Sequence, residues 1–340
     1  MEDRHINAGV YLSPMKGEII HTLILSTAKE IRKRTTDVVV KPSKSSPNYE
    51  EYFPTYKGLE KPLKKEVEGR SLLINLKMFN DNLIVEAKAE FDEKESAAIL
   101  KLKNVLAEEC ERVAKQYQPS ALSEEYTFFC IAEYEDYDKY ISANKVKITS
   151  LLKDEAEELT GREVEDTISA SIRYGKEDTV IIDWDGAFIL DKGKEFDEII
   201  SLLELANIQL LNLRLLDFKL QEDIGRIRKL IDFGRLKIFQ LSYYSKEIVK
   251  LRSKALLEFD SIENMIKLYG DWYSARLYGI ASRKLSIDKW RSAVEAKLGL
   301  LRDIYTIITE RVAESYNIIL EASIVVLIIV EILLAVMKVY

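Results

Sequence analysis

Two aspartates, Asp183 and Asp185, have the spacing expected of a divalent-cation site. Residues two apart on a strand project from the same face, so the two carboxylates could hold Mg²⁺ between them. The pair lies between two apolar runs, Val180–Ile182 and Phe188–Leu190, and is followed by Gly186. Because Asp-Gly between apolar runs is the usual two-residue turn of a β-hairpin, we favour a turn and keep the metal site as the alternative.

A second acidic group occurs where an apolar strand is expected to pass into a helix. Carboxylates at the start of a helix cap its free amide groups and offset its dipole. Capping is therefore the favoured role of this group, and a divalent-ion site is the minor one. The group consists of Glu133, Glu135, Asp136 and Asp138.

The other residue types that serve metal or nucleophilic chemistry are scarce. The two histidines, His5 and His21, have no cysteine or carboxylate at the spacing of a zinc or iron site. The two cysteines, Cys110 and Cys130, stand in apolar patterns and suit a reducing compartment. The glycines form neither a phosphate-binding loop nor a dinucleotide fingerprint. We expect no cofactor, no bound metal and no catalytic residue.

One basic stretch in a leucine-rich helical region could contact anionic lipid headgroups or RNA. The net charge of −7 means that the chain as a whole is repelled by nucleic acid. A solvated helix face is therefore the favoured interpretation, and nucleic acid or a ribosome is the less favoured partner. The stretch contains Arg226, Arg228, Lys229, Arg235 and Lys237.

Residues 318–337 form a segment with the length and composition of a transmembrane helix. All of its residues are apolar except Glu321, Ser323 and Glu331. A helix of this length spans about 30 Å, the thickness of the hydrocarbon core. A buried core helix is the alternative, but it would not be expected to stay apolar on every face. The sequence therefore predicts one membrane-spanning helix at the C-terminal end.

The two glutamates of this segment are energetically unusual. Glu331 lies near its centre, where an acid costs on the order of 3 kcal/mol on insertion scales, whereas Glu321 can reach the headgroups. The two carboxyls are about 80° apart around the helix and can face one side. Two interpretations stay open. The acids are neutral or paired with Lys338, or they specify contact with another helix in the membrane.

The N-terminal residues predict where the rest of the protein lies. The opening Met1-Glu2-Asp3 and the short apolar run Ile19–Leu25, interrupted by His21, do not resemble a secretion signal. We expect a single-pass protein with the bulk of its mass in the cytoplasm.

Proline and hydrophobic periodicity predict the domain boundaries. Residues 41–65 hold four of the six prolines, so 1–65 is expected to be an N-terminal segment with a Pro/Ser-rich linker. Interleaved strands and helices then predict an α+β domain over 66–193. Asp92 and Glu95 have the form of a capping box for its first helix. The expected strands cover 72–78, 83–89, 126–132, 167–173, 180–182 and 188–190, and the expected helices cover 92–117 and 137–152.

From residue 194 onward, apolar residues recur every three or four positions and proline is absent. Apolar seams in 241–273 and 287–316, joined by Tyr278–Ser282, predict an antiparallel helical hairpin over 194–316. A homo-oligomeric coiled coil could use the same seams. The expected fold is therefore an α+β domain followed by a long helical hairpin or coiled coil, ending in one transmembrane helix over 317–340.

The last 210 residues or so resemble a family of unknown function that includes the "required for meiotic nuclear division" and Sad1-interacting proteins. The resemblance rests on Phe128–Glu133, Val180–Ile189, Phe196–Ile200 and above all on Leu320-Glu321 followed by Leu327–Ile332. A Phe-Trp-Gly usual in relatives is replaced here by Phe188–Asp191. The resemblance implies a distant microbial branch and a non-enzymatic, membrane-associated protein whose relatives support processes such as mitochondrial translation.

These observations favour a membrane-anchored, non-enzymatic scaffold or assembly and regulatory protein that acts through its α+β domain and helical stalk. The expected partners are the membrane and a second copy of the chain or another membrane protein. The alternatives are a nucleotide- or metal-dependent enzyme that uses Asp183 and Asp185, and a membrane tether for ribosomes or RNA.

Overall fold

The computed structural model describes most of the chain and divides it into two compact units. The first unit comprises Met1–Arg214 and Ser261–Lys289, and the second comprises Leu215–Asp260 and Trp290–Tyr340. Within these bounds the described residues are 14–27, 31, 35–37, 56–59, 61–117, 122–155, 159–173, 175, 178–232, eight positions between 246 and 257, and 272–339.

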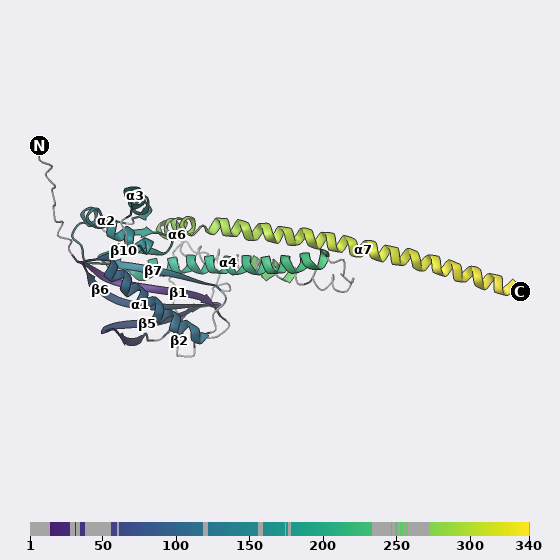
Figure 1. Ribbon diagram of the computed structural model, residues 1–340, viewed down its shortest axis with the longest axis horizontal. Helices are drawn as coiled ribbons and strands as arrows, with labels where there is room; N and C mark the ends of the chain where they lie inside the picture. The colour runs from purple at the N-terminus through teal and green to yellow at the C-terminus, as the bar shows by residue number, and fades with distance from the viewer. Residues whose placement is uncertain are drawn as a thin grey trace, which may run out of the picture. The chain divides into compact units, whose positions relative to one another are not determined.

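A mixed sheet of ten strands forms the first unit (Figure 1). Its strand order is β2-β3-β5-β6-β1-β7-β10-β9-β8, and β4 pairs with β5 off this path. All described pairings are antiparallel except that of β10 with β7. The strands are β1 (Met15–Ser26), β2 (Thr35–Asp37), β3 (Tyr56–Leu59), β4 (Leu63–Val67), β5 (Arg70–Phe79), β6 (Asn82–Glu93), β7 (Ser123–Ile131), β8 (Ser171–Ile172), β9 (Asp178–Ile182) and β10 (Gly186–Asp191).

The N-terminal strand β1 lies in the middle of the sheet. It pairs with β6 from Met15↔Glu93 to Ser26↔Asn82, and with β7 on its other side. The described residues before position 65 are therefore part of the α+β unit, and the domain boundary expected there is wrong. The reason is that β1 is covered on both faces, so its apolar run supplies core residues to each side.

Helices of the first unit cover both faces of this sheet. The helices of the described chain are α1 (Ser96–Ala114), continued by a 3-10 turn (Lys115–Tyr117), α2 (Tyr137–Lys153), α3 (Gly161–Ser169), α4 (Phe196–Asp232), α6 (Trp272–Lys284) and α7 (Ile287–Val339). The second half of α4 and nearly all of α7 belong to the second unit. On one face, α1 and α2 pack Leu106 and Ile148 against strand residues such as Phe129 and form a hydrophobic core. The first half of α4, up to Arg214, packs on the opposite face (Figure 1).

A glycine allows β1 and β7 to approach closely at one end of the sheet. A Cβ atom on Gly17 would lie 2.3 Å from the carbonyl oxygen of Cys130 and 2.5 Å from Cδ1 of Ile131. The first of these contacts is with backbone, which cannot move aside without changing the strand pairing. This position therefore requires glycine.

Several predicted elements are confirmed. The alternating residues of 72–78 and 83–89 form β5 and β6, which are joined by the turn at Asn80-Asp81. The expected strand 126–132 lies within β7 apart from its last residue, and the expected helix 137–152 is α2. The two apolar runs around Asp183 form the antiparallel pair β9 and β10.

Two predicted boundaries in the first unit are wrong. The capping box does not form, because Asp92 lies inside β6, where neighbouring Phe91 is buried in the core; α1 begins only at Ser96. The expected strand 167–173 begins with the end of helix α3, and only Ser171–Ile172 form a strand, β8. Thr160 caps α3 by accepting a hydrogen bond from the Glu163 amide at 3.3 Å, and helical spacing buries Val164 and Thr167.

The expected break in the helical region is also misplaced. Tyr278–Ser282 lies inside α6, because Leu277, Ala281 and Leu285 are buried at four-residue spacing. The break comes at Leu285-Ser286, where Ser286 has a left-handed φ of 52°. The seam expected over 241–273 lies almost wholly outside the described residues.

In the second unit, α7 continues without interruption from the expected seam into the apolar segment. Its buried residues include Val294, Leu298, Leu301 and Ile308. Within this unit, Lys297 on α7 forms a 2.8 Å ion pair with Asp217 on α4, so these two helices lie side by side here.

Candidate functional site

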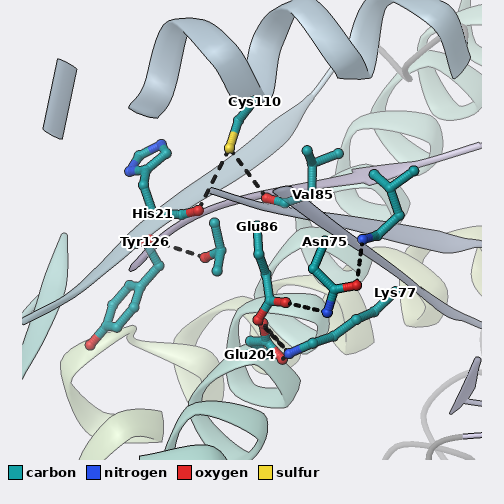
Figure 2. Close-up of polar contacts among 10 residues, drawn as sticks. His21, Asn75, Lys77, Val85, Glu86, Cys110, Tyr126 and Glu204 are labelled. Carbon is teal, nitrogen blue, oxygen red and sulfur yellow. Dashed lines mark hydrogen bonds and ion pairs between the residues drawn. The ribbon is translucent and has the colours of Figure 1, made fainter. Parts of the chain in front are cut away.

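The most distinctive polar group in the first unit is a buried cluster of three ionisable side chains. Lys77 of β5, Glu86 of β6 and Glu204 of α4 meet between the sheet and the helix (Figure 2). The Lys77 ammonium lies 3.0 Å and 3.2 Å from the two carboxylate oxygens of Glu204 and forms an ion pair with Glu86. We call Lys77, Glu86 and Glu204 the ionic cluster.

Strand alternation explains why these residues meet. Lys77 and Glu86 lie between residues whose side chains point into the α1 core, such as Leu76 and Val85, so their own side chains point to the other face. There the apolar first half of α4 excludes water. The exposed fractions of the side chains are 14% for Lys77, 11% for Glu86 and 1% for Glu204.

A neutral side chain holds Glu86 in place. The Asn75 side-chain amide donates a 2.9 Å hydrogen bond to Glu86, and its oxygen accepts one from the Leu76 backbone amide at 3.0 Å (Figure 2). The carboxylate of Glu86 therefore receives contacts from both β5 side chains that neighbour it on this face. Such satisfied polar groups fix one arrangement of helix and sheet.

The two carboxyls of the ionic cluster have opposite pKa shifts. Burial, the largest influence, raises the pKa of Glu204 to about 8, and the nearby Glu86 charge adds to this while Lys77 opposes it. Burial also favours a raised pKa for Glu86. In that case, however, the Lys77 ammonium and hydrogen bonds from Glu204 and Asn75 prevail, and the pKa of Glu86 is lowered. At neutral pH, Glu204 is thus mainly protonated and Glu86 ionised.

The α1 face carries a second set of buried polar groups. His21 of β1 shares a 3.0 Å hydrogen bond between Nδ1 and the Thr127 hydroxyl, and burial lowers the pKa of His21 to about 4. The Cys110 thiol donates to the backbone carbonyls of His21 and Val85, and burial raises its pKa (Figure 2). A neutral imidazole and a protonated thiol make this a structural group and not a nucleophile.

Comparison with known proteins identifies the family. A domain described as "Uncharacterized protein MJ0711, N-terminal domain" matches residues 71–197. The Uncharacterized protein MJ0711 of Methanocaldococcus jannaschii is 36% identical over 292 residues, which cover 86% of this chain and 89% of that protein. The chain belongs to the MJ0711 family. No solved structure matches it.

The MJ0711 domain match covers only part of the ionic cluster. Its span runs from β5 to the first residues of α4 and contains Lys77 and Glu86, whereas Glu204 follows its end. The family's description states no activity. The resemblance to the "required for meiotic nuclear division" family is not tested by these matches and stays a prediction.

In this member of the MJ0711 family, Asp183 has cationic partners from two helices. It lies in the turn between β9 and β10, where its amide donates to the Gly186 carbonyl at 2.9 Å. Its carboxylate lies 2.9 Å from the Lys153 ammonium and 3.4 Å from that of Lys284. Asp185 lies in the same turn with an exposed surface, and the partial desolvation of its carboxyl by nearby atoms raises its pKa.

The turn itself is confirmed, with one difference. Ile182 pairs with Ala187, so Trp184 and Asp185 occupy the centre of the turn and Gly186 begins β10. Within the part of the chain that the structure describes, no group of three histidine, cysteine or carboxylate side chains could hold a metal. Two lysines already compensate the Asp183 charge, which favours the turn; the cation site at Asp183 and Asp185 stays an untested alternative.

One of the four residues in the acidic group before α2, Asp136, caps that helix. Asp136 accepts a 2.9 Å hydrogen bond from the Lys139 amide. Glu133 pairs with Lys16 at 3.0 Å.

The basic stretch is placed only in part. Arg226 pairs with Asp223 one turn earlier on α4, and Arg228 and Lys229 are exposed. Arg235 and Lys237 lie outside the described residues. The solvated helix face favoured above agrees with the part that is described.

A cavity of about 490 Å³ opens beside the start of α4, at the ends of β1, β6 and β7. It is lined mainly by charged residues. Several of these neutralise one another, since Lys16 pairs with Glu133, and Arg70 pairs with Glu93 at 2.7 Å. Even so, the lining holds five acidic and three basic side chains, so its charge is negative on balance.

The apolar segment of α7 is fully exposed. Tyr316–Ala335 has a mean hydropathy of 2.8 and no buried side chain, and it is long and apolar enough to cross a membrane. A second helix, Phe196–Lys229, passes the same test of length and composition, but 72% of its most apolar window is buried in the protein. The apolar window of Phe196–Lys229 is thus mostly covered by the protein itself, whereas that of Tyr316–Ala335 is not.

The polar residues of this segment differ in whether their side chains have a hydrogen-bond or ion-pair partner. Ser323 donates a 2.7 Å hydrogen bond to the Leu320 carbonyl of its own helix. Glu321 and Glu331 are exposed and form no ion pair within the described residues. The side chain of Lys338, the partner considered for Glu331, is outside the described set.

Proposed function

We propose that this protein is a single-pass membrane protein that acts without catalysis, as a scaffold or assembly factor whose first unit faces the cytoplasm. The observation that carries the proposal is the exposed apolar segment Tyr316–Ala335. An exposed surface of this size that is apolar at nearly every position is not stable in water, so lipid or protein must cover it.

Lipid suits this segment better than a protein partner alone. Its 20 residues match the hydrocarbon thickness of about 30 Å. Apolar side chains also surround the helix, whereas a coiled-coil partner needs only one apolar stripe. The buried seam of α7, which includes Val294 and Leu301, precedes this segment and supports a helical hairpin with α4.

The two acids support recruitment of another membrane helix. Glu331 lies deep in the segment, where an isolated carboxyl is costly and a polar partner helix would satisfy it. The partner in this proposal is a second copy of the chain or another membrane protein.

Site-specific cross-linking in membranes tests this contact. A photoreactive residue at Leu327, one turn before Glu331, is expected to give cross-links, and one at Ile329, on the opposite side, is expected to give few. Glu331→Leu should abolish the Leu327 cross-link and leave the protein in the membrane. Equal cross-linking from both positions, unaffected by Glu331→Leu, would contradict a contact specified by this acid.

The enzyme and ribosome-tether alternatives have less support. The Asp183 carboxylate is already paired with Lys153 and Lys284, and Arg226 is paired with Asp223. These pairings lower the support for both alternatives, although Asp185, Arg228 and Lys229 are exposed.

A further inference from the structure

The ionic cluster contains more acidic groups than basic ones. Lys77 supplies one positive charge, while Glu86 and Glu204 would supply two negative charges if both were ionised. Their side chains are at most 14% exposed, so water cannot compensate for the difference. A net buried charge costs several kcal/mol even after relaxation of the protein. Binding one proton removes that charge.

The geometry provides a place for this proton. The carboxyl groups of Glu86 and Glu204 both contact the same Lys77 ammonium, so they lie close together, and a proton on one of them would allow it to donate to the other. Glu86 also accepts from Asn75 and pairs with Lys77, so it is the better anion. Glu204, the most buried of the three side chains, is then the proton donor.

We propose that Glu204 and Glu86 share one proton beside Lys77, and that this proton makes the docking of α4 on the sheet pH-sensitive. The cluster joins two strands of the sheet to the first half of α4. When the proton is lost, the contact holds an uncompensated negative charge, and docking weakens.

The direction of the pH dependence follows from the pKa of Glu204. The pKa is about 8 with α4 docked and near 4.5 when the carboxyl is in water. The docked form thus binds more protons between these values, so docking weakens as pH rises from about 4.5 to about 8 and then changes no further. A single proton changes the opening constant about ten-fold per pH unit within this window.

The effect of Glu204 on the docking of α4 can be separated from the effects of the other ionisable groups at this contact. The groups that act on Glu204 are Lys77 from β5 and Glu86 from β6. Farther along α4, Arg214 pairs with Glu124 of β7, whose pKa burial raises. The pKa of Glu86 is lowered, so its contribution lies below this window. Substitution of Glu204 separates its effect from that of Glu124.

Hydrogen exchange of the full chain in mild detergent, measured from about pH 5 to 9, tests the proposal. After correction for intrinsic exchange, amides of the first half of α4 should open more readily by about ten-fold per pH unit up to about pH 8. In Glu204→Gln the part of this dependence that is due to Glu204 should disappear, because the amide can donate to Glu86 but cannot ionise, and at most the contribution of Glu124 should remain. Glu86→Gln should also flatten it, since Glu204 then balances Lys77 alone.

A pH-independent opening of α4 in the unsubstituted protein would overturn the proposal. So would a Glu204→Gln variant that keeps the original profile. If one glutamine variant does not fold, the pH profile of the unsubstituted protein still shows whether opening of α4 depends on pH. The glutamine variant that does fold then shows whether the ionic cluster causes that dependence.

Discussion

Replacing Lys77 by methionine is expected to lower the free energy of unfolding of the first unit by about 3–5 kcal/mol. The substitution keeps the length and apolar volume of the side chain but removes the only cation of the ionic cluster. Glu86 would then remain ionised next to Asn75 and Glu204, or would have to bind a second proton. Either outcome is costly, because water does not reach the cluster.

The same cost should disappear when the acids are removed together with the lysine. In the triple variant Lys77→Met, Glu86→Met and Glu204→Met, apolar packing replaces the ionic contacts, and most of the lost stability should return. Lys16→Met is the matched control, because the Lys16–Glu133 pair is exposed and its loss should leave stability unchanged. The measurement is urea unfolding of the full chain in detergent, followed by pulse proteolysis. A Lys77→Met variant no less stable than Lys16→Met would contradict this interpretation.

The second large effect is expected at Gly17. In Gly17→Ala the new methyl group would lie 2.3 Å from the Cys130 carbonyl oxygen. Since β1 is bonded to β6 on its other side, it cannot move away from β7 without breaking another pairing. We expect a loss of about 3 kcal/mol, at the upper end of overpacking substitutions.

Gly225→Ala is the control for this substitution. Gly225 lies in α4 with no atom near the site of a Cβ, so alanine should stabilise the helix by about 0.5–1 kcal/mol. Hydrogen exchange of the β1 and α4 peptides measures both effects. Unchanged protection of β1 in Gly17→Ala would show that the strands tolerate the methyl group.

Regular alternation of apolar and polar residues made some strands of the sheet predictable. The central strand β1 lacks this alternation and was not predicted. In β5 and β6 one face is apolar and the other polar, so period-two spacing identifies them. β1 is buried on both faces, and its apolar run Ile19–Leu25 carries a buried His21 that hydrogen-bonds to Thr127. A short run of this kind does not differ from many other apolar segments until its pairing partners are known.

The ionic cluster was missed for a related reason. Lys77 and Glu86 occupy the polar positions of alternating strands, which are usually exposed to solvent, and only the cover provided by α4 buries them. One signal was present in the sequence. Glu204 is the only charged residue in 199–213, so a buried carboxyl with a partner elsewhere was to be expected there.

Extraction of membranes with alkaline carbonate tests the central claim, that Tyr316–Ala335 spans a membrane, most directly. The full chain should stay in the membrane pellet, and a variant that ends at Glu314 should appear in the supernatant as a folded protein. Release of the full chain by alkali, or retention of the shortened variant in the pellet to the same extent, would contradict the anchor.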